Sequence, residues 1–388
     1  MVGSQDHPYN GIEVVFVKEI NIARAILEGR KRKNITQEEL ARYMGVSKAS
    51  VSKWETGQSY PDITFLPQLA TYFNISIDDL MGYEPQMTKE EIRDLYHQLS
   101  GEFANLPFET VMEACGATMK KYYSCYPLLL QMAVLLLNHV NLAATEERQR
   151  EIMTEIRDLC IRIKSESDDF ALEKQANFLE AICELSLGNA QDVIDLMEPV
   201  NDPLLGDEVI LASAHYALGN VYEAIETTQV GIFQHLMAIF GILPSYLMFH
   251  TDDPVKYEAI VNRTLGLIEL FHVRSLHPAI LFGLYLTGAQ GYLVLGDEEK
   301  ALGILEQYTS LAMADIYPIK FSGDEFFDKV DGWFEGFDLG VKPPRSDGSI
   351  RAGMADALSK NAAFQLLADS DRFKVMVERL ESLKTRGD

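Results

Sequence analysis

The side chains that most often catalyse reactions or bind metals are present in this chain of 388 residues, but their spacing fits neither role. The eight histidines lack the paired spacing of metal ligands, and no HExxH, GxSxG or phosphate-loop motif is present. The segment from Gly291 to Gly296 begins like a phosphate loop, but Asp297 stands where that loop requires lysine. We therefore expect no enzyme, no metal site and no cofactor.

The cysteines and the N-terminus indicate a reducing compartment. None of the four cysteines forms a CxxC pair, and each falls in a helix-like apolar pattern, so we expect buried free thiols. No long apolar run follows a basic segment at the N-terminus, so no signal peptide is expected. The predicted location is the cytoplasm.

A clearer pattern lies in residues 36–57, TQEELARYMGVSKASVSKWETG. Thr36 and Glu39 have the spacing of a capping box, and Gly45 can adopt the positive φ that a sharp turn needs. Ser47 can cap a second helix, whose inner side carries Trp54. Two short helices joined by a glycine turn are typical of a helix-turn-helix unit. The outer face of the second helix is small, polar and basic, with Lys48, Ala49, Ser52 and Lys53.

The charge of the chain is unevenly distributed. The net charge is −24, yet residues 18–60 carry nine Lys and Arg against five Glu, an excess of four positive charges. The other residues must then carry −28. Because DNA phosphates repel acidic protein surface, only residues 18–60 are expected to contact nucleic acid.

At these residues the chain closely resembles the Cro-type (xenobiotic-response-element) helix-turn-helix family. The matching segments are TQEELA at 36–41, GVS at 45–47 and SKWETG at 52–57. The resemblance extends from Ile20 to Gly82, roughly a sixth of the chain. It implies a five-helix, lambda-repressor-like domain that binds double-stranded DNA. One such domain buries little surface on DNA, so we expect a homodimer on a palindromic operator.

The resemblance also implies which residues contact DNA. Lysines at 48 and 53 would donate hydrogen bonds to guanine, and the alanine between them would contact a thymine methyl group. Gln37 would bind backbone phosphate, and Ser47 would do so in addition to capping its helix. An ordinary solvated helix face is the alternative interpretation of both lysines. The full set of predicted contacts is Gln37, Ser47, Lys48, Ala49, Ser50, Ser52 and Lys53.

Beyond the basic region the pattern is helical throughout, with no strand alternation, so the fold class is all-α. Leu-Gly pairs at 187, 218 and 295 each join a helix to an acidic helix start, which resembles the turns of tetratricopeptide repeats. Prolines, including Pro244, are expected to interrupt helices. The expected organisation is a flexible extension (1–18), a DNA-binding domain (19–83), a linker (84–88), a tetratricopeptide-like repeat domain (89–322) and capping helices (323–388).

A helical-repeat domain that follows a DNA-binding domain of this kind resembles the peptide-pheromone receptors of Gram-positive bacteria. In those receptors, asparagine side chains hydrogen-bond to the backbone of the bound peptide. The candidates here are Asn138, Asn141, Asn177, Asn262 and Gln290, although each could be an ordinary surface or packing residue. The apolar stretch 230–249 is expected to be a buried helix, with a groove wall or dimer face as alternatives. Gln234, His235 and Pro244 argue against a membrane span.

Three functions remain open from the sequence. The first is a dimeric transcription regulator whose body senses a peptide or small molecule. The second is a constitutive repressor whose body serves only dimerisation or protein–protein interaction. The third is an enzyme or toxin-system component with a regulatory head, which the missing catalytic residues disfavour.

Overall fold

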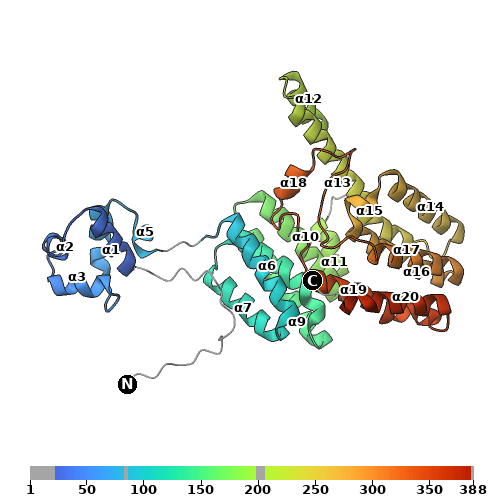
Figure 1. Ribbon diagram of the computed structural model, residues 1–388, viewed down its shortest axis with the longest axis horizontal. Coiled ribbons are helices and arrows are strands. Elements are labelled where there is room, and N and C mark those ends of the chain that lie inside the picture. The colour runs from blue at the N-terminus through green and yellow to red at the C-terminus, as the bar shows by residue number, and fades with distance from the viewer. Residues whose placement is uncertain (1–21, 83–85, 198–205, 386–388) are drawn as a thin grey trace. The chain divides into compact units, whose positions relative to one another are not determined.

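The computed structural model describes residues 22–82, 86–197 and 206–385, and it contains helices and turns but no strand in those ranges (Figure 1). The chain divides into two compact units, Met1–Met87 and Thr88–Asp388, here called the head and the body. The expected extension (1–18) and residues 84 and 85 of the expected linker lie outside the described residues.

The head contains five short helices around one core. They are α1 (Ile22–Arg32), α2 (Gln37–Met44), α3 (Lys48–Glu55), α4 (Leu66–Phe73) and α5 (Ile77–Met81), with a 3₁₀ turn at Ile63–Phe65. Thr36 and Glu39 form the expected capping box, and Gly45 takes a φ of 70° between α2 and α3. Ser76 and Asp79 form a second capping box at α5. Buried side chains from all five helices, Trp54 among them, make up the core.

The body begins with six helices packed as neighbouring antiparallel pairs. Helix α9 packs against both α8 and α10, and α11 packs against α10. Their bounds are α6 (Lys89–Asn105), α7 (Phe108–Lys121), α8 (Tyr126–His139), α9 (Glu146–Glu166), α10 (Phe170–Leu187) and α11 (Ala190–Met197), with a 3₁₀ turn at Val140–Leu142.

The second part of the body follows residue 205. Helix α16 packs against α13 and α17, and α17 packs against α20. The helices are α12 (Asp207–Ala217), α13 (Val221–Met248), α14 (Pro254–Leu270), α15 (Val273–Leu276), α16 (Pro278–Val294), α17 (Glu298–Ala312), α18 (Asp331–Glu335), α19 (Asp347–Ser359) and α20 (Asp371–Glu381). Two further 3₁₀ segments are Ala362–Leu367 and Ser382–Thr385.

The Leu-Gly pairs mark tight turns, as expected. Gly188, Gly219 and Gly296 have φ values of 92°, 82° and 76°, which only glycine adopts without strain. They join the helical hairpins α10–α11, α12–α13 and α16–α17. The expected interruption at Pro244 is wrong, because α13 continues through this proline to Met248.

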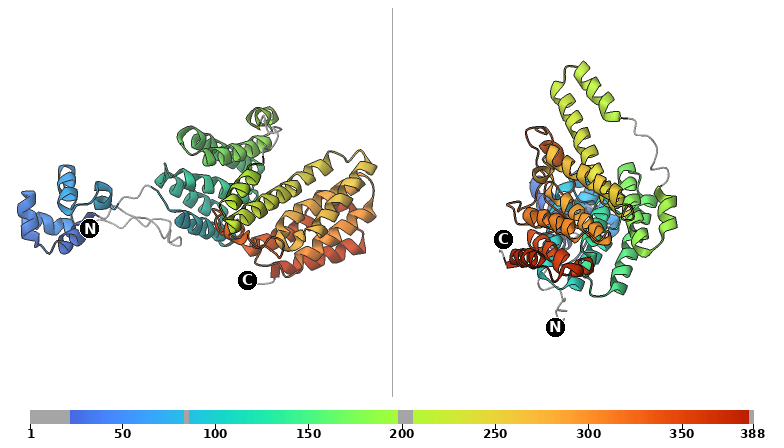
Figure 2. Two further views of the ribbon diagram at one scale, coloured as in Figure 1. Left: turned by 90° about the horizontal axis from the view of Figure 1, so that it is seen from above. Right: turned by 90° about the vertical axis from the view of Figure 1, so that its right-hand side faces the viewer.

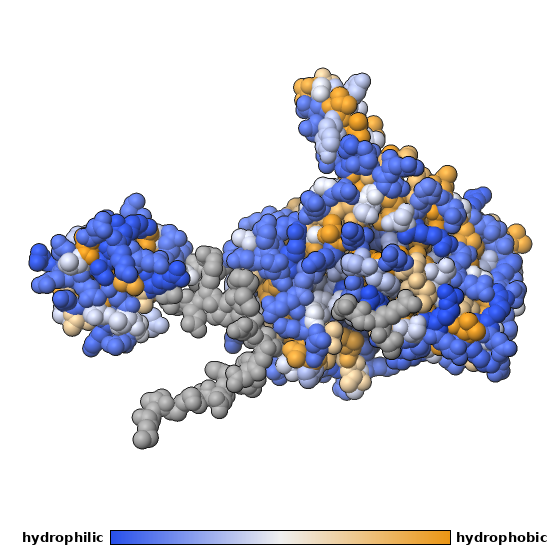
Figure 3. All heavy atoms as spheres, viewed as in Figure 1, coloured by the Kyte–Doolittle hydropathy of each residue, from blue (hydrophilic) through white to orange (hydrophobic). Residues whose placement is uncertain are grey.

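Helix α12 and the first half of α13 form a hairpin that projects from the rest of the body (Figures 1 and 2). No residue of α12 is buried. Figure 3 shows apolar surface along this hairpin, and Ile210 and Leu218 are 71% and 77% exposed. The expectation of a buried helix over 230–249 is therefore only half right. Phe233, Leu236, Phe240 and Leu247 enter the core, while Ile232, Ile239 and Ile242 remain exposed.

By length and composition, α13 is the one helix in the described ranges that could cross a membrane, and 28% of its most apolar window is buried within the protein. Its inner face packs against the C-terminal segment, where Phe233 contacts Phe327 and Phe334 with ring centroids 5.5 and 5.1 Å apart.

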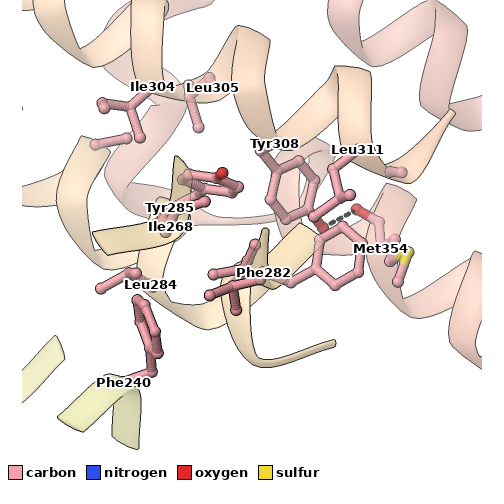
Figure 4. Packing of buried hydrophobic residues seen from close by; sticks show 14 of the residues in the cluster. Phe240, Ile268, Phe282, Leu284, Tyr285, Ile304, Leu305, Tyr308, Leu311 and Met354 are labelled. Atoms are coloured by element: carbon pink, nitrogen blue, oxygen red, sulfur yellow. Dashed lines mark hydrogen bonds between the residues drawn. The ribbon is translucent and has the colours of Figure 1, made fainter. Parts of the chain in front are cut away.

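The core of the second part of the body joins α13, α14, α16, α17, α19 and α20 (Figure 4). Tyr308 on α17 donates a hydrogen bond from its hydroxyl to the carbonyl of Met354 on α19 at 2.8 Å. The segment after α18 then returns to α6, where Arg93 Nε donates to the carbonyl of Asp338 at 3.0 Å. The C-terminal segment therefore covers α17 and also ties the two parts of the body together.

Candidate nucleic-acid interface

The outer face of α3 carries the residues expected to read bases. Lys48, Ala49 and Lys53 are exposed, while Ser50 and Ser52 are half-buried beside them. Val51 and Trp54, on the opposite face, are buried in the head core. Core packing therefore holds α3 in place and leaves its small basic face open, as insertion into a major groove requires.

Ser47 holds the N-terminus of α3. Its Oγ accepts a hydrogen bond from the backbone N–H of Ser50 at 3.1 Å and lies 2.9 Å from the hydroxyl of Ser50. The remaining N–H groups of that first turn carry the positive end of the helix dipole. This end of α3 thus suits a DNA phosphate, the contact expected of Ser47.

Gln37 takes part in a network that joins α1, α2 and α3. Its Nε2 donates to Glu55 Oε2 at 2.7 Å, while Arg30 Nε donates to Glu55 Oε1 at 2.5 Å. Arg30 also donates to the carbonyl of Ile35 at 2.8 Å. Burial alone would raise the pKa of Glu55, but the hydrogen bonds from Arg30 and Gln37 outweigh it and hold the pKa below its ordinary value. The carboxylate is therefore charged at neutral pH and orients Gln37.

The structure separates the four cations at the end of α1 into two roles. Arg30 and Arg32 brace the head, because Arg32 Nη2 donates to the carbonyl of Phe73 at 3.3 Å. Lys31 and Lys33 are exposed, and the Lys33 ammonium lies 5.1 Å from the Tyr72 ring centroid. Lys31 and Lys33 are therefore the members of the cluster best placed to neutralise phosphate.

Four of the five polar residues expected to bind a ligand lie on four different α-helices of the body, and the fifth, Asn141, lies in the 3₁₀ turn after α8. Asn138 Nδ2 donates to the carbonyl of Val134 at 2.9 Å, and Asn141 Oδ1 accepts from Arg345 at 3.3 Å. Asn177 Oδ1 accepts from Lys164 Nζ at 2.9 Å, and Asn262 hydrogen-bonds to Glu258. Gln290 lies half-buried on α16. Four of the five amides thus already have partners within the chain.

The expected thiol state is observed, since Cys115, Cys125, Cys160 and Cys183 are all free and buried. Burial raises the pKa of Cys160 to about 12 and that of Cys183 to about 11, so neither is a reactive thiolate. Within the three described ranges, no group of three or more His, Cys, Asp or Glu side chains could hold a metal ion.

Comparison with known proteins assigns the head to a family. Residues 26–80 match the family described as Helix-turn-helix. Over 51 residues the chain is 35% identical to an uncharacterised HTH-type transcriptional regulator, MJ0272 of Methanocaldococcus jannaschii, covering 13% of this chain and 77% of that protein. The chain belongs to the helix-turn-helix family of DNA-binding transcriptional regulators, which is not a family of enzymes.

A second relative is the HTH-type transcriptional activator BcrR of Enterococcus faecalis. It is 35% identical over 78 residues, which cover 19% of this chain and 38% of BcrR. The chain thus spans well under half the length of this curated relative.

Solved structures of the competence regulator ComR also align with the chain at 14% identity. The apo form from Streptococcus vestibularis aligns over 83% of this chain and 99% of its own, with a TM-score of 0.27. ComR from S. thermophilus, in complex with DNA and its signalling peptide ComS, aligns over 75% and 92%, with a TM-score of 0.20.

Proposed function

We propose that this protein is a cytoplasmic, homodimeric transcription regulator that recognises a palindromic operator through α3 and whose body responds to a peptide or small-molecule ligand. The observation that carries the proposal is the outer face of α3. Five small or basic side chains there, at positions 48, 49, 50, 52 and 53, are wholly or partly exposed on a helix whose other face is fixed in the core.

The body supports self-association through the α12–α13 hairpin. We define its apolar surface as the exposed side chains of Val209, Ile210, Leu211, Tyr216, Leu218, Val221, Tyr222 and Ile225. Monomeric proteins rarely expose a contiguous apolar surface of this kind, so such a surface usually marks an interaction site. A second copy is its proposed occupant, since two heads are needed on a palindrome and an identical hairpin offers matching apolar side chains.

A constitutive repressor, whose body only dimerises, remains the second candidate. The apolar surface of the hairpin supports a constitutive repressor as strongly as it supports a ligand-responsive regulator. The two differ in whether a ligand changes the affinity for operator DNA, because an effector must bind two states of the protein with different affinity.

The test of the head compares two lysines that we assign different roles. Lys53→Ala should reduce the preference for the operator over random DNA by about 1–3 kcal/mol, because one contact to a base edge is lost. Lys31→Ala should weaken binding to both DNAs alike and reduce the salt dependence by about one phosphate contact.

Fluorescence anisotropy at several salt concentrations, with operator DNA selected from random sequence, measures both effects. Circular dichroism provides the folding control for each variant. Operator preference that is unchanged by Lys53→Ala in a folded protein would overturn the assignment of α3 as the reading helix.

A further inference from the structure

Two adjoining cavities lie on the body; α6 and the segment that precedes α19 line the smaller one, and α15, α16, α17 and residues 314–322 line the larger one. Their volumes are about 380 and 640 Å³, and Pro318 and Lys320 line both. We call the pair the basic groove. Volumes in this range are typical of sites for small organic ligands.

The smaller cavity is positively charged although the body is strongly acidic. Lys320, Lys342 and Arg345 line it, against a single carboxylate, Asp347. None of these three cations has a carboxylate within ion-pair distance among the residues that the structure describes. Several other cations of the body do have a carboxylate partner within the chain. Lys300, Arg372 and Lys384, for example, all form ion pairs.

Arg345 is the most constrained of the three cations. Its side chain is half-buried and donates hydrogen bonds to the carbonyl of Asn138 and to Asn141 Oδ1, both neutral acceptors. Burial lowers the pKa of Arg345, with a smaller opposing effect from Tyr96. A guanidinium held away from water without a counter-ion is costly, and an anion in the adjoining cavity would offset that cost.

The rest of the smaller cavity is apolar or hydrogen-bonding. Ile319, Val341 and Pro343 supply apolar walls, and Ser346 caps α19 at the edge of the cavity. A ligand that fits here needs an anionic group for the cations and an apolar part for the walls.

We propose that the basic groove binds an organic carboxylate with an apolar body, either a small amphiphilic acid or the C-terminal carboxylate of a short peptide. A regulatory role for this site rests on the proposed ligand response, whereas binding of the carboxylate does not depend on it. The site also gives the side chain of Asn141 a role, since this amide positions Arg345 rather than touching the ligand, whereas Asn138 contributes only its backbone carbonyl.

Calorimetric titration of the full chain with octanoate and with octanamide tests the requirement for charge. The two probes share an apolar chain and differ in charge, so octanoate should bind about tenfold more tightly or better. Equal affinity for the two probes, or binding of neither, would overturn the proposal.

Two lysine variants test the location. Lys342→Gln and Lys320→Gln should each weaken octanoate binding by about three- to tenfold and leave octanamide unchanged. Lys360→Gln is the matched control, because Lys360 is an exposed lysine just after the C-terminal end of α19 and pairs with Asp356 outside the groove. Octanoate binding that is indifferent to both lysine variants would place the ligand elsewhere, for example on the apolar hairpin.

A competition experiment decides whether the groove binds a small acid or the C-terminal carboxylate of a peptide. The tetrapeptide Leu-Ala-Ala-Leu with a free C-terminus should displace octanoate, and its C-terminal amide should not, if the groove takes peptides. Failure of both peptides to displace octanoate assigns the groove to small acids. Operator affinity measured with and without octanoate separates the proposed carboxylate site from the proposed ligand response. If octanoate binds but does not change operator affinity, the ligand response is contradicted while the carboxylate site is supported.

Discussion

Arg30 on α1 and Glu55 on α3 form an ion pair with two hydrogen bonds, from Nε to Oε1 at 2.5 Å and from Nη2 to Oε2 at 3.1 Å. The two side chains are only 16% and 4% exposed. Because Glu55 also receives the amide of Gln37, this pair fixes the last turn of α3 relative to α1 and α2. The face of α3 that we propose reads bases therefore depends on a partly buried charge pair behind it.

Glu55→Ala should destabilise the head, since it leaves Arg30 partly buried without its counter-charge. Breaking a buried pair of this kind costs about 3–5 kcal/mol. Urea unfolding followed by Trp54 fluorescence, in a Trp333→Phe background so that Trp54 is the sole tryptophan, measures the loss.

Arg24→Ala is the matched control for that experiment. Arg24 pairs with Glu28 on the same α1 helix, but the two side chains are 72% and 63% exposed. Exposed pairs contribute about 0–1 kcal/mol, so the control should unfold almost as the parent does. Equal losses from the two substitutions would contradict the structural role of Glu55.

Gly291 should be irreplaceable for steric reasons rather than for any phosphate-loop chemistry. A β-carbon at this position would lie 2.0 Å from the hydroxyl oxygen of Tyr257, which donates to the carbonyl of Gly288 at 2.8 Å. Gly291→Ala must therefore push α14 and α16 apart, at a cost of about 1–3 kcal/mol. Thermal unfolding followed by circular dichroism measures the change.

Gly283→Ala offers the matched comparison on the same helix. No atom lies within 4 Å of a β-carbon placed there. Alanine is the better helix former, so this substitution should stabilise α16 by about 0.5–1 kcal/mol. Shifts of the same sign for the two variants would show that helix propensity, and not the contact with Tyr257, decides the outcome.

The head shows how much local sequence determines. Capping at Thr36, the turn at Gly45 and the burial of Trp54 depend on neighbours within a few residues, so spacing alone predicts them. The partner of Glu55 is Arg30, which is 25 residues away along the chain, and no sequence pattern identifies that pair. Long-range side-chain pairing is decided by packing, which no local pattern encodes.

The body shows where such reasoning ends. Periodicity identifies the apolar residues of α13, but it cannot say what covers them, so the exposure of the hairpin was not predicted. Pro244 was expected to end a helix and instead lies inside one, because tertiary packing of α13 outweighs the lost hydrogen bond. The basic groove joins residues 97–101 with 318–320 and 341–347, three segments that only the fold brings together.

The body should lose stability as the pH falls from about 6.5 to 4 because of His277. Burial lowers the pKa of His277 from 6.5 to about 4, and its Nδ1 accepts the N–H of Ile280 at 3.3 Å at the start of α16. Between these pH values the unfolded chain binds a proton that the folded chain excludes, so stability rises with pH. The shift corresponds to about 3 kcal/mol in total.

His277→Asn isolates this contribution. Asparagine can still cap α16 but does not titrate, so the variant should lose less stability between pH 7 and pH 4 than the parent does. Urea unfolding at a series of pH values, monitored by circular dichroism, provides the comparison. Parallel curves for the two proteins would show that other groups cause the acid sensitivity.

The apolar surface of the α12–α13 hairpin should hold the dimer together. Ile210→Glu and Leu218→Glu each introduce a charge at a position that is more than two-thirds exposed in the monomer. Each variant should therefore fold normally as a monomer. In a dimer that charge would be buried, which should raise the dissociation constant by about tenfold or more. Sedimentation equilibrium measures the constant directly.

Leu366→Glu is the control for these two variants, because Leu366 is 71% exposed on a 3₁₀ segment of the body outside the hairpin. It should leave the dissociation constant unchanged. The hairpin variants should also bind operator DNA more weakly at low protein concentration, since each head then acts alone, while the affinity of a single half-site stays constant. A parent protein that is monomeric, or that binds lipid vesicles through the hairpin, would contradict self-association as the role of this surface.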